Sequence, residues 1–297
     1  MGDNMRDNNF IIENNAKHLW HPMGAPGDSI NNPPKVITNA NGSQISDMDG
    51  HTTVDAVGGL WCVNLGYSNE AVKNAISEQL NHLPYYSGFA GTTNPAAIEA
   101  SYMVKEMFKA DGMEKVFFTS GGSDSVETCL RLSRQYHRLR GEPTRTKFIS
   151  LKKGYHGTHF GGASVNGNNR FRIAYEPLLP GCFHLPSPYT YRNPFNETDS
   201  QKLALNIAQA FEDEIAFQDK NTIAAFIMEP IQGAGGVIVP DPSFMGLMQE
   251  ICERNGILMI SDEVITGFGR TGSWSGARHW NVKPDMMSMA KGITSGY

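Results

Sequence analysis

The sequence predicts an α/β fold in which a mainly parallel sheet is flanked by helices. Two observations support this: short runs that are apolar throughout recur along the chain, and stretches with helical apolar spacing separate them. Strands buried on both faces have such runs, and intervening helices allow them to lie in parallel. The predicted strands are residues 115–119, 148–151, 224–228, 257–260 and 286–289.

The N-terminal part has a different pattern. Residues 1–35 are polar and rich in asparagine, which is typical of an extended arm. From residue 36 to 57, β-type runs are divided by Asn41-Gly42 and Asp49-Gly50, dipeptides that accept the positive φ of tight hairpin turns. We therefore expect a small antiparallel meander. We assign residues 1–65 to the arm and part of a small α+β domain, and residues 66–297 to a large domain.

Helices are expected between and beside the strands. Apolar spacing predicts helices over residues 69–80 and 95–110. The strand at 115–119 leads through Ser120-Gly121-Gly122-Ser123 into an amphipathic helix that stops near Gly141. A further helix from Pro242 or Ser243 to Asn255 is ended by Gly256.

Composition excludes several classes of function. The net charge of −5 and the pI near 6.0 provide no electrostatic footprint for nucleic acid or an anionic membrane. No stretch approaches the roughly 20 apolar residues of a membrane span, and the polar start lacks a signal-peptide segment. We therefore expect a cytoplasmic protein. Cysteines are widely spaced without a CxxC pair, so no zinc site or disulfide framework is indicated: Cys62, Cys129, Cys182 and Cys252.

The glycine turn at residues 120–123 is the first candidate site. Gly121 and Gly122 let backbone N–H groups turn toward a ligand, and Ser123 can cap the following helix and place a phosphate at its positive end. It is not a P-loop, because no Lys-Ser or Lys-Thr follows at the required spacing. An ordinary strand-to-helix turn is the alternative.

An acid and an amine follow later strands. Asp262 can pair with a protonated pyridine nitrogen, whereas Glu263 is interpreted as the structural member of the pair. Lys291 can form an imine with an aldehyde cofactor and then move a proton at the substrate carbon. The alternatives are a helix cap or salt bridge for the acid and a solvated surface charge for the lysine.

Two further residues follow strand ends. Tyr155, in Gly154-Tyr155-His156-Gly157, can stack on a flat cofactor, and Glu229 can hydrogen-bond the cofactor or position other polar groups. A core tyrosine and a structural carboxylate are the alternatives. Because all these groups follow predicted strands, we expect them to converge on one edge of the sheet.

Together these segments resemble the class III pyridoxal-phosphate aminotransferases, the ω-aminotransferase group of the fold type I enzymes. The matching stretches are residues 119–128, 154–157, 228–230, 261–272 and 290–292. The resemblance implies pyridoxal 5'-phosphate as cofactor. It implies that Gly122 and Ser123 hold the phosphate, that Tyr155 and Val264 lie on the two faces of the ring, and that Asp262 binds its nitrogen.

The same resemblance implies the rest of the chemistry. Lys291 carries the covalent link to the cofactor, and Glu229 belongs to the surrounding polar network. The reaction consists of two half-reactions, in which an amino donor converts the cofactor to pyridoxamine phosphate and a keto acid converts it back. Such enzymes are usually homodimers with small-molecule substrates.

Residues 59–67 and 83–89 look like pocket segments of family members that use ω-amino acids or amines with pyruvate. Trp61, Phe89 and Tyr155 are the candidates for pocket walls, with core packing as the alternative for the first two. We expect a transaminase of this substrate class. An aminomutase, a decarboxylase or a non-catalytic fragment of such an enzyme is the alternative.

Family members continue well beyond the lysine. We expect a protein that ends at Tyr297 to leave hydrophobic surface uncovered, and hence to be poorly stable and nearly inactive. The partner-subunit threonine and the carboxylate-binding arginine of the family have no counterpart to assign here.

Overall fold

A computed structural model describes residues 7–297. They form two compact units, one of residues 7–84 with Tyr297 and one of residues 85–296. The predicted domain division at residue 65 stays a prediction.

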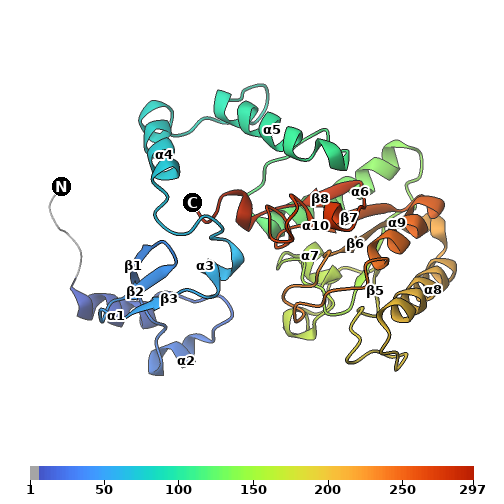
Figure 1. Ribbon diagram of the computed structural model, residues 1–297, viewed down its shortest axis with the longest axis horizontal. Helices are drawn as coiled ribbons and strands as arrows, with labels where there is room; N and C mark the ends of the chain where they lie inside the picture. Colours follow the sequence, from blue (N-terminus) through green and yellow to red (C-terminus); the bar gives the residue numbers. More distant parts are fainter. Residues whose placement is uncertain (1–6) are drawn as a thin grey trace. The chain divides into compact units, whose positions relative to one another are not determined.

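The first unit contains a three-stranded antiparallel sheet in the order β1-β2-β3 (Figure 1). Gly42 and Gly50 adopt φ of 57° and 86° at the two hairpin turns, where only glycine avoids steric strain. The predicted meander is therefore confirmed. The elements of this unit are α1 (Asn8–Lys17), α2 (Pro26–Asn31), β1 (Ile37–Asn41), β2 (Gln44–Asp47), β3 (Thr52–Val54), α3 (Gly58–Trp61) and α4 (Glu70–His82).

The second unit is built on a five-stranded sheet in the order β5-β4-β6-β7-β8, with every neighbouring pair parallel. The strands are β4 (Lys147–Leu151), β5 (Cys182–Leu185), β6 (Ile223–Met228), β7 (Leu258–Asp262) and β8 (Met286–Ser288). The helices of eight or more residues are α5 (Pro95–Met107), α6 (Gly122–Leu139), α8 (Ser200–Gln218) and α9 (Phe244–Asn255). The short ones are α7 (Phe160–Val165) and α10 (Gly276–His279).

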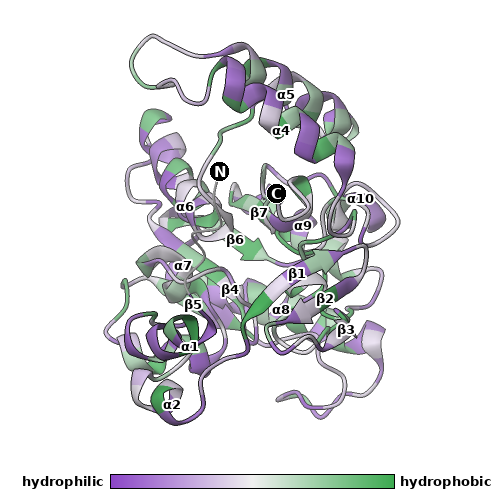
Figure 2. Ribbon diagram, turned by 90° about the vertical axis from the view of Figure 1, so that its left-hand side faces the viewer, coloured by the Kyte–Doolittle hydropathy of each residue, from purple (hydrophilic) through white to green (hydrophobic). Residues whose placement is uncertain are grey.

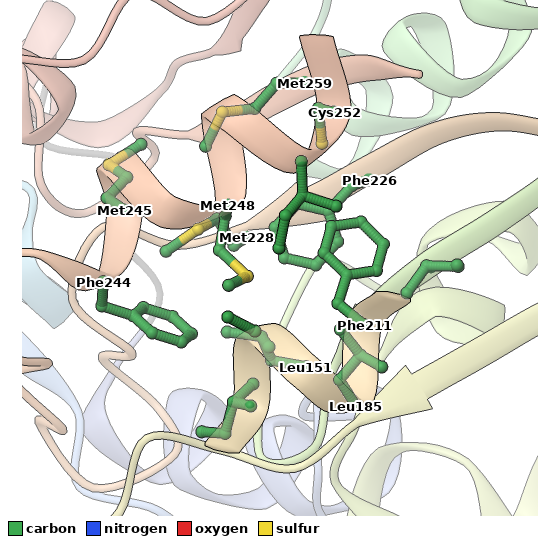
Figure 3. Packing of buried hydrophobic residues seen from close by; sticks show 14 of the residues in the cluster. Leu151, Leu185, Phe211, Phe226, Met228, Phe244, Met245, Met248, Cys252 and Met259 are labelled. Atoms are coloured by element: carbon green, nitrogen blue, oxygen red, sulfur yellow. The ribbon is translucent and has the colours of Figure 1, made fainter. Parts of the chain in front are cut away.

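Both faces of this sheet are covered, as its apolar strands require. Along β6 every residue is buried, and successive side chains point to opposite faces. Phe226 and Met228 join the cluster with α8 and α9, where Phe211 and Met248 lie (Figure 3). Alternate residues, such as Ile227, pack instead with α6 and α7. Figure 2 shows the hydrophobic colouring of β6 and β7 between the more polar helices.

One predicted strand is wrong. Residues 115–119 lead into α6 as the pattern predicts, but they form no strand. Phe117 and Phe118 are 66% and 50% exposed. A strand is stabilised by its hydrogen-bonded neighbour, and within residues 7–297 this segment pairs with none, since the sheet ends at β8.

The elements that the sequence analysis does not predict include β5, at one edge of the sheet, and the long helix α8. The buried face of α8 includes Leu203, Ile207 and Phe211. In the described part of the chain, no helix is both long and apolar enough to cross a membrane.

Candidate active site

The candidate residues follow neighbouring strands at the carboxyl edge of the sheet. Asp262, the last residue of β7, pairs in register with Ser288, the last residue of β8. The N–H of Glu263 donates to the carbonyl of Ser288 over 2.8 Å. Glu229 follows the end of β6, and Lys291 lies three residues beyond β8. Parallel strands therefore bring the acid, the second carboxylate and the amine to one edge.

Asp262 is 3% exposed and its carboxylate is held by three donors. The hydroxyl of Ser288 and the N–H of Val264 donate to Oδ1 over 3.0 and 3.2 Å. Nδ1 of His156 lies 2.8 Å from Oδ2 and donates to it, because a carboxylate only accepts. The carboxylate is thus fixed in orientation by groups from the segment after β7, from β8 and from the loop after β4.

His156 is a buried residue of this edge that the sequence analysis does not select. It lies within the motif Gly154-Tyr155-His156-Gly157, from which the analysis selects only the tyrosine. The side chain is fully buried, and its Nε2 has no hydrogen-bond partner. A histidine beside a selected aromatic residue in a strand-end motif was the available signal.

The glycine turn meets the segments after β7 and β8. A Cβ placed on Gly122 would lie 3.1 Å from both γ-methyl carbons of Val264 and 3.5 Å from Cβ of Ala290. Ala290 immediately precedes Lys291. Helix α6 begins at Gly122 with Gly121 as its N-cap, and no side chain caps it. Its first N–H groups and positive dipole end therefore suit an anion.

The predicted capping role of Ser123 is wrong. Ser123 lies inside the first turn of α6, one residue past its start, so that it is not the N-cap. Its hydroxyl instead accepts a hydrogen bond from the N–H of Thr158 over 3.2 Å. A Cβ on Gly157 would come within 2.6 Å of the same hydroxyl, so the glycine permits this close approach. The helix begins two residues earlier than expected because Gly121, with extended backbone, is the N-cap in place of Ser123.

Glu229 connects the loop after β4 to the loop after β6. It is 5% exposed, and its carboxylate accepts from the N–H groups of Tyr155 and Gly233 over 2.9 and 2.8 Å. Burial raises the pKa of Glu229 to about 7. The nearby His156 acts to lower this pKa, and the negative charge of Asp262 acts to raise it. The carboxylate therefore fixes the backbone that presents Tyr155.

Tyr155 is half-buried and its ring packs against Phe171, with 4.7 Å between ring centroids. Burial and the negative charge of Asp262 both raise the pKa of its hydroxyl. Its hydroxyl therefore stays protonated near neutral pH.

Lys291 lines a cavity of about 630 Å³. Residues Ser120 and Gly121 of the glycine turn line it too, together with apolar side chains of α5 and of residues 113–118. Asp262 and Tyr155 do not line this cavity. Lys291 and the glycine turn thus border the same cavity.

Glu263 has a structural environment. It is completely buried and accepts four hydrogen bonds, from the hydroxyls of Ser261 and Thr266 and the N–H groups of Gly276 and Ala277. The last two lie at the start of α10, so Glu263 holds that helix against β7. Burial raises the pKa of Glu263, although the four hydrogen bonds each act to lower it. No acceptor position remains for a ligand, as the structural interpretation of this residue expects.

The other two candidates for pocket walls, Trp61 and Phe89, differ in their burial. Trp61 belongs to the first unit and is partly buried, whereas Phe89 of the second unit is 84% exposed and packs in no core.

In the first unit, Asp47, Asp49 and His51 place one possible metal-ligand atom each within 4.8 Å of one another. Asp47 accepts the N–H groups of the other two in this hairpin turn, which explains their proximity without an ion.

Comparison with known proteins places this geometry in a family. The family model described as aminotransferase class-III matches residues 27–297. The putrescine–pyruvate aminotransferase of Pseudomonas aeruginosa is 39% identical over 89% of the chain and 57% of its own length. An omega-aminotransferase of Caulobacter vibrioides is 35% identical over 95% of the chain and 64% of its own length.

Solved structures agree. An amine transaminase from an uncultivated Pseudomonas species, determined with pyridoxal phosphate bound, is 46% identical with a TM-score of 0.92 over 94% of the chain and 63% of its own. An (S)-enantioselective omega-transaminase from Thermomicrobium roseum is 35% identical with a TM-score of 0.95 over 99% and 65%. The predicted α/β fold is confirmed. The chain spans less than two thirds of the length of each of these relatives.

Proposed function

The chain belongs to the class III aminotransferases, and we propose that the protein is a pyridoxal-phosphate-dependent transaminase. It moves an amino group from an ω-amino acid or primary amine to pyruvate or a similar keto acid. The observation that carries this proposal is the meeting of Gly122, Val264 and Ala290 within contact distance. That meeting brings an uncapped helix N-terminus, the segment after Asp262 and the segment of Lys291 to one point.

The donors and acceptors fit pyridoxal phosphate. The two oxygens of Asp262 offer about four acceptor positions, of which Ser288, Val264 and His156 use three. Two of these donors act on Oδ1 and one on Oδ2, so the remaining position is on Oδ2. A protonated pyridine nitrogen supplies the N–H that would use it. The first turn of α6 offers N–H groups for the phosphate.

When bound, the cofactor supplies an aldehyde that takes up an amino group and a cationic ring that stabilises negative charge at the substrate carbon. Gly122 and Ser123 bind the phosphate through backbone N–H groups. Tyr155 and Val264 exclude water from the two faces of the ring. Asp262 holds the ring nitrogen protonated.

The reactive amine would be that of Lys291, which would hold the cofactor covalently until a substrate amine displaces it. The freed Nζ would then hold and move a proton. Glu229 positions Tyr155 through the backbone N–H of that residue. These are the roles that the resemblance to the class III aminotransferases implies for these residues.

The names of the relatives support the proposed class of substrate. Relatives named for putrescine with pyruvate, for hypotaurine or taurine with pyruvate, and for γ-aminobutyrate support an ω-amino group as the donated one. Trp61, Phe89 and Tyr155 are the proposed pocket walls. We also propose a homodimer in the cytoplasm.

The test is covalent labelling. The protein is incubated with pyridoxal phosphate, reduced with borohydride and digested, and the modified lysine is identified by mass spectrometry. We expect the label on Lys291 and its loss in Lys291→Ala. Lys202→Ala is the matched control, because Lys202 is an exposed lysine of α8, a helix that contributes no residue to the proposed site. Labelling that persists in Lys291→Ala would remove the assignment.

A second measurement separates transamination from its rivals. With donor alone, a transaminase converts its bound cofactor to pyridoxamine phosphate in a stoichiometric amount. A decarboxylase releases carbon dioxide instead, and an aminomutase returns the cofactor unchanged. Putrescine, taurine, β-alanine, 4-aminobutyrate and 1-phenylethylamine are the donors to compare.

A further inference from the structure

The short helix α3 of the first unit is left-handed. The values of φ are 59°, 60°, 70° and 64° at its four residues, Gly58, Gly59, Leu60 and Trp61. The N–H of Trp61 donates to the carbonyl of Val57 over 2.8 Å, which closes the turn. Left-handed backbone brings Cβ too close to the following carbonyl oxygen, so it is costly for residues other than glycine. Among the described residues, no other adjacent pair of non-glycine residues shares positive φ. The turn therefore needs support from outside its own backbone.

The carboxylate of Asp55 provides this support. Its Oδ1 accepts from the N–H groups of Val57 and Gly58, each over 3.1 Å. Its Oδ2 accepts from the N–H of Gly59 over 2.6 Å and from the hydroxyl of Tyr67 over 2.7 Å. A carboxylate has about four acceptor positions, so the turn and one tyrosine use all of them.

Tyr67 connects this carboxylate to the antiparallel sheet. Its N–H donates to the carbonyl of Gly42 over 2.8 Å, and its carbonyl accepts from the N–H of Gly42 over 3.1 Å. The hydrogen bond between the two side chains lowers the pKa of Asp55 and raises the pKa of Tyr67 to about 12. The carboxylate is therefore charged and the phenol protonated near neutral pH, which makes this a strong hydrogen bond.

Core packing does not explain why the turn is left-handed. Leu60 is 61% exposed, and within the described part of the chain no side chain of α3 belongs to a hydrophobic core cluster. Strained backbone outside a core indicates a function. Trp61 is the residue of this turn that is proposed to line the substrate pocket. Because the allowed side-chain rotamers depend on φ and ψ, the support from Asp55 determines where the indole ring can lie.

We propose that Asp55 is a positioning residue for Trp61: together with the hydroxyl of Tyr67 it holds the left-handed turn, and the turn fixes the indole ring as a wall of the substrate pocket. This inference rests on the proposed function. Asp55 itself contacts neither substrate nor cofactor. The donors that depend on it are amines with an apolar or aromatic group, since such a group packs on the indole ring, whereas a short ω-amino acid has no such group.

Four variants separate this role from a general effect on stability. Asp55→Asn replaces one acceptor oxygen by an amide that only donates, and Tyr67→Phe removes the hydroxyl alone. Leu60→Gly lowers the cost of left-handed backbone at an exposed position, and it is combined with Asp55→Asn to test rescue. Asp28→Asn is the matched control, because Asp28 is an exposed acid of α2 in the same unit.

Two measurements report on Trp61. The first is ¹⁹F NMR of protein labelled with 5-fluorotryptophan, in which the signal of Trp61 is assigned with Trp61→Phe. The second is the ratio of kcat/KM for 1-phenylethylamine to kcat/KM for β-alanine, with pyruvate as acceptor and the protein loaded with pyridoxal phosphate. A partly unfolded preparation lowers both values in proportion, so a merely structural defect leaves this ratio unchanged.

We expect Asp55→Asn and Tyr67→Phe to shift or broaden the Trp61 signal while the other tryptophan signals stay in place. The ratio should fall at least about threefold, through a higher KM for 1-phenylethylamine at unchanged kcat. Adding Leu60→Gly to Asp55→Asn should return the ratio to within about twofold of the parent value, because glycine adopts positive φ without strain. Asp28→Asn should change neither the signal nor the ratio.

Three results would overturn the inference. They are an unmoved Trp61 signal in Asp55→Asn and Tyr67→Phe, a ratio that is unchanged or higher in these variants, and a double variant that is no closer to the parent than Asp55→Asn. If Asp55→Asn does not fold, Tyr67→Phe decides alone.

Failure of the proposed function is distinguishable from failure of this inference. A parent protein that takes up no cofactor on Lys291 and converts no amine refutes the proposed function, and the ¹⁹F signal still decides whether Asp55 positions Trp61. A parent that is labelled on Lys291 and active, with variants that share its ratio, refutes the inference alone.

Discussion

Adding a methyl group to Gly122 tests whether the glycine turn meets the segments after β7 and β8. In Gly122→Ala the new Cβ lies 3.1 Å from both γ-methyl carbons of Val264. Carbon atoms prefer separations of about 3.5–4.0 Å, so each contact is short by roughly half an ångström. Overpacking of this kind costs about 1–3 kcal/mol. Because Val264 is only partly buried and can yield, we expect a loss at the lower end, about 1 kcal/mol.

The neighbouring glycine provides a matched control. A Cβ on Gly121 meets nothing within 4 Å, and its φ of 171° is extended backbone that any residue adopts. Gly121→Ala should therefore change stability by less than about 0.5 kcal/mol. Both variants are measured by urea denaturation without cofactor, so the readout is independent of cofactor binding.

A double mutant identifies the contact. Val264→Ala removes both γ-methyl groups, so Gly122→Ala should cost less in that background, with a coupling energy of at least about 0.5 kcal/mol. Two results would show that the segments do not meet as described. One is a Gly122→Ala variant as stable as Gly121→Ala, and the other is an equal cost of Gly122→Ala in the parent and in the Val264→Ala background.

Three further outcomes are expected. Glu229 has a pKa raised from 4.5 to about 7, so the folded state binds more protons between these values and stability falls as pH rises through them, by up to about 3 kcal/mol. Glu229→Gln should flatten this part of the pH–stability curve, and an unchanged slope would contradict the assignment. Asp111 is buried and accepts from Arg278 and Ser275. Asp111→Ala should cost about 2–4 kcal/mol in urea denaturation because Arg278 loses its partner, and a loss below about 1 kcal/mol would refute this. Lys291→Ala should abolish covalent cofactor attachment while circular dichroism stays unchanged, and loss of the fold would assign the lysine a structural role instead.

Much of the second unit could be predicted, because its strands are apolar throughout and its helices are amphipathic. The ends of β6 and β7 could be located from the runs before Glu229 and Asp262. Because parallel strands end at the same edge of a sheet, residues that follow these strands were expected to lie together there. The strand at residues 115–119 could not be judged in the same way, because strand formation depends on a neighbour rather than on the segment's own apolar pattern.

The finer features of the site needed side-chain geometry. Asp262 and Glu263 are adjacent and chemically alike, but the four donors around Glu263 and the open acceptor position of Asp262 depend on which way each side chain points. His156 contacts a residue 106 positions away in sequence, and the motif that contains this histidine does not show that contact. Ser123 looked like a cap, and only the extended backbone of Gly121 shows that the helix begins earlier.

The most direct test of the central claim is a crystal structure of the protein with pyridoxal phosphate. The claim is that the glycine turn, Asp262 and Lys291 bind the same cofactor molecule. We expect continuous density from Nζ of Lys291 to the cofactor, the phosphate at the first turn of α6, and the pyridine nitrogen within hydrogen-bonding distance of Oδ2 of Asp262. A phosphate bound elsewhere, or a ring nitrogen out of reach of Asp262, would contradict the account.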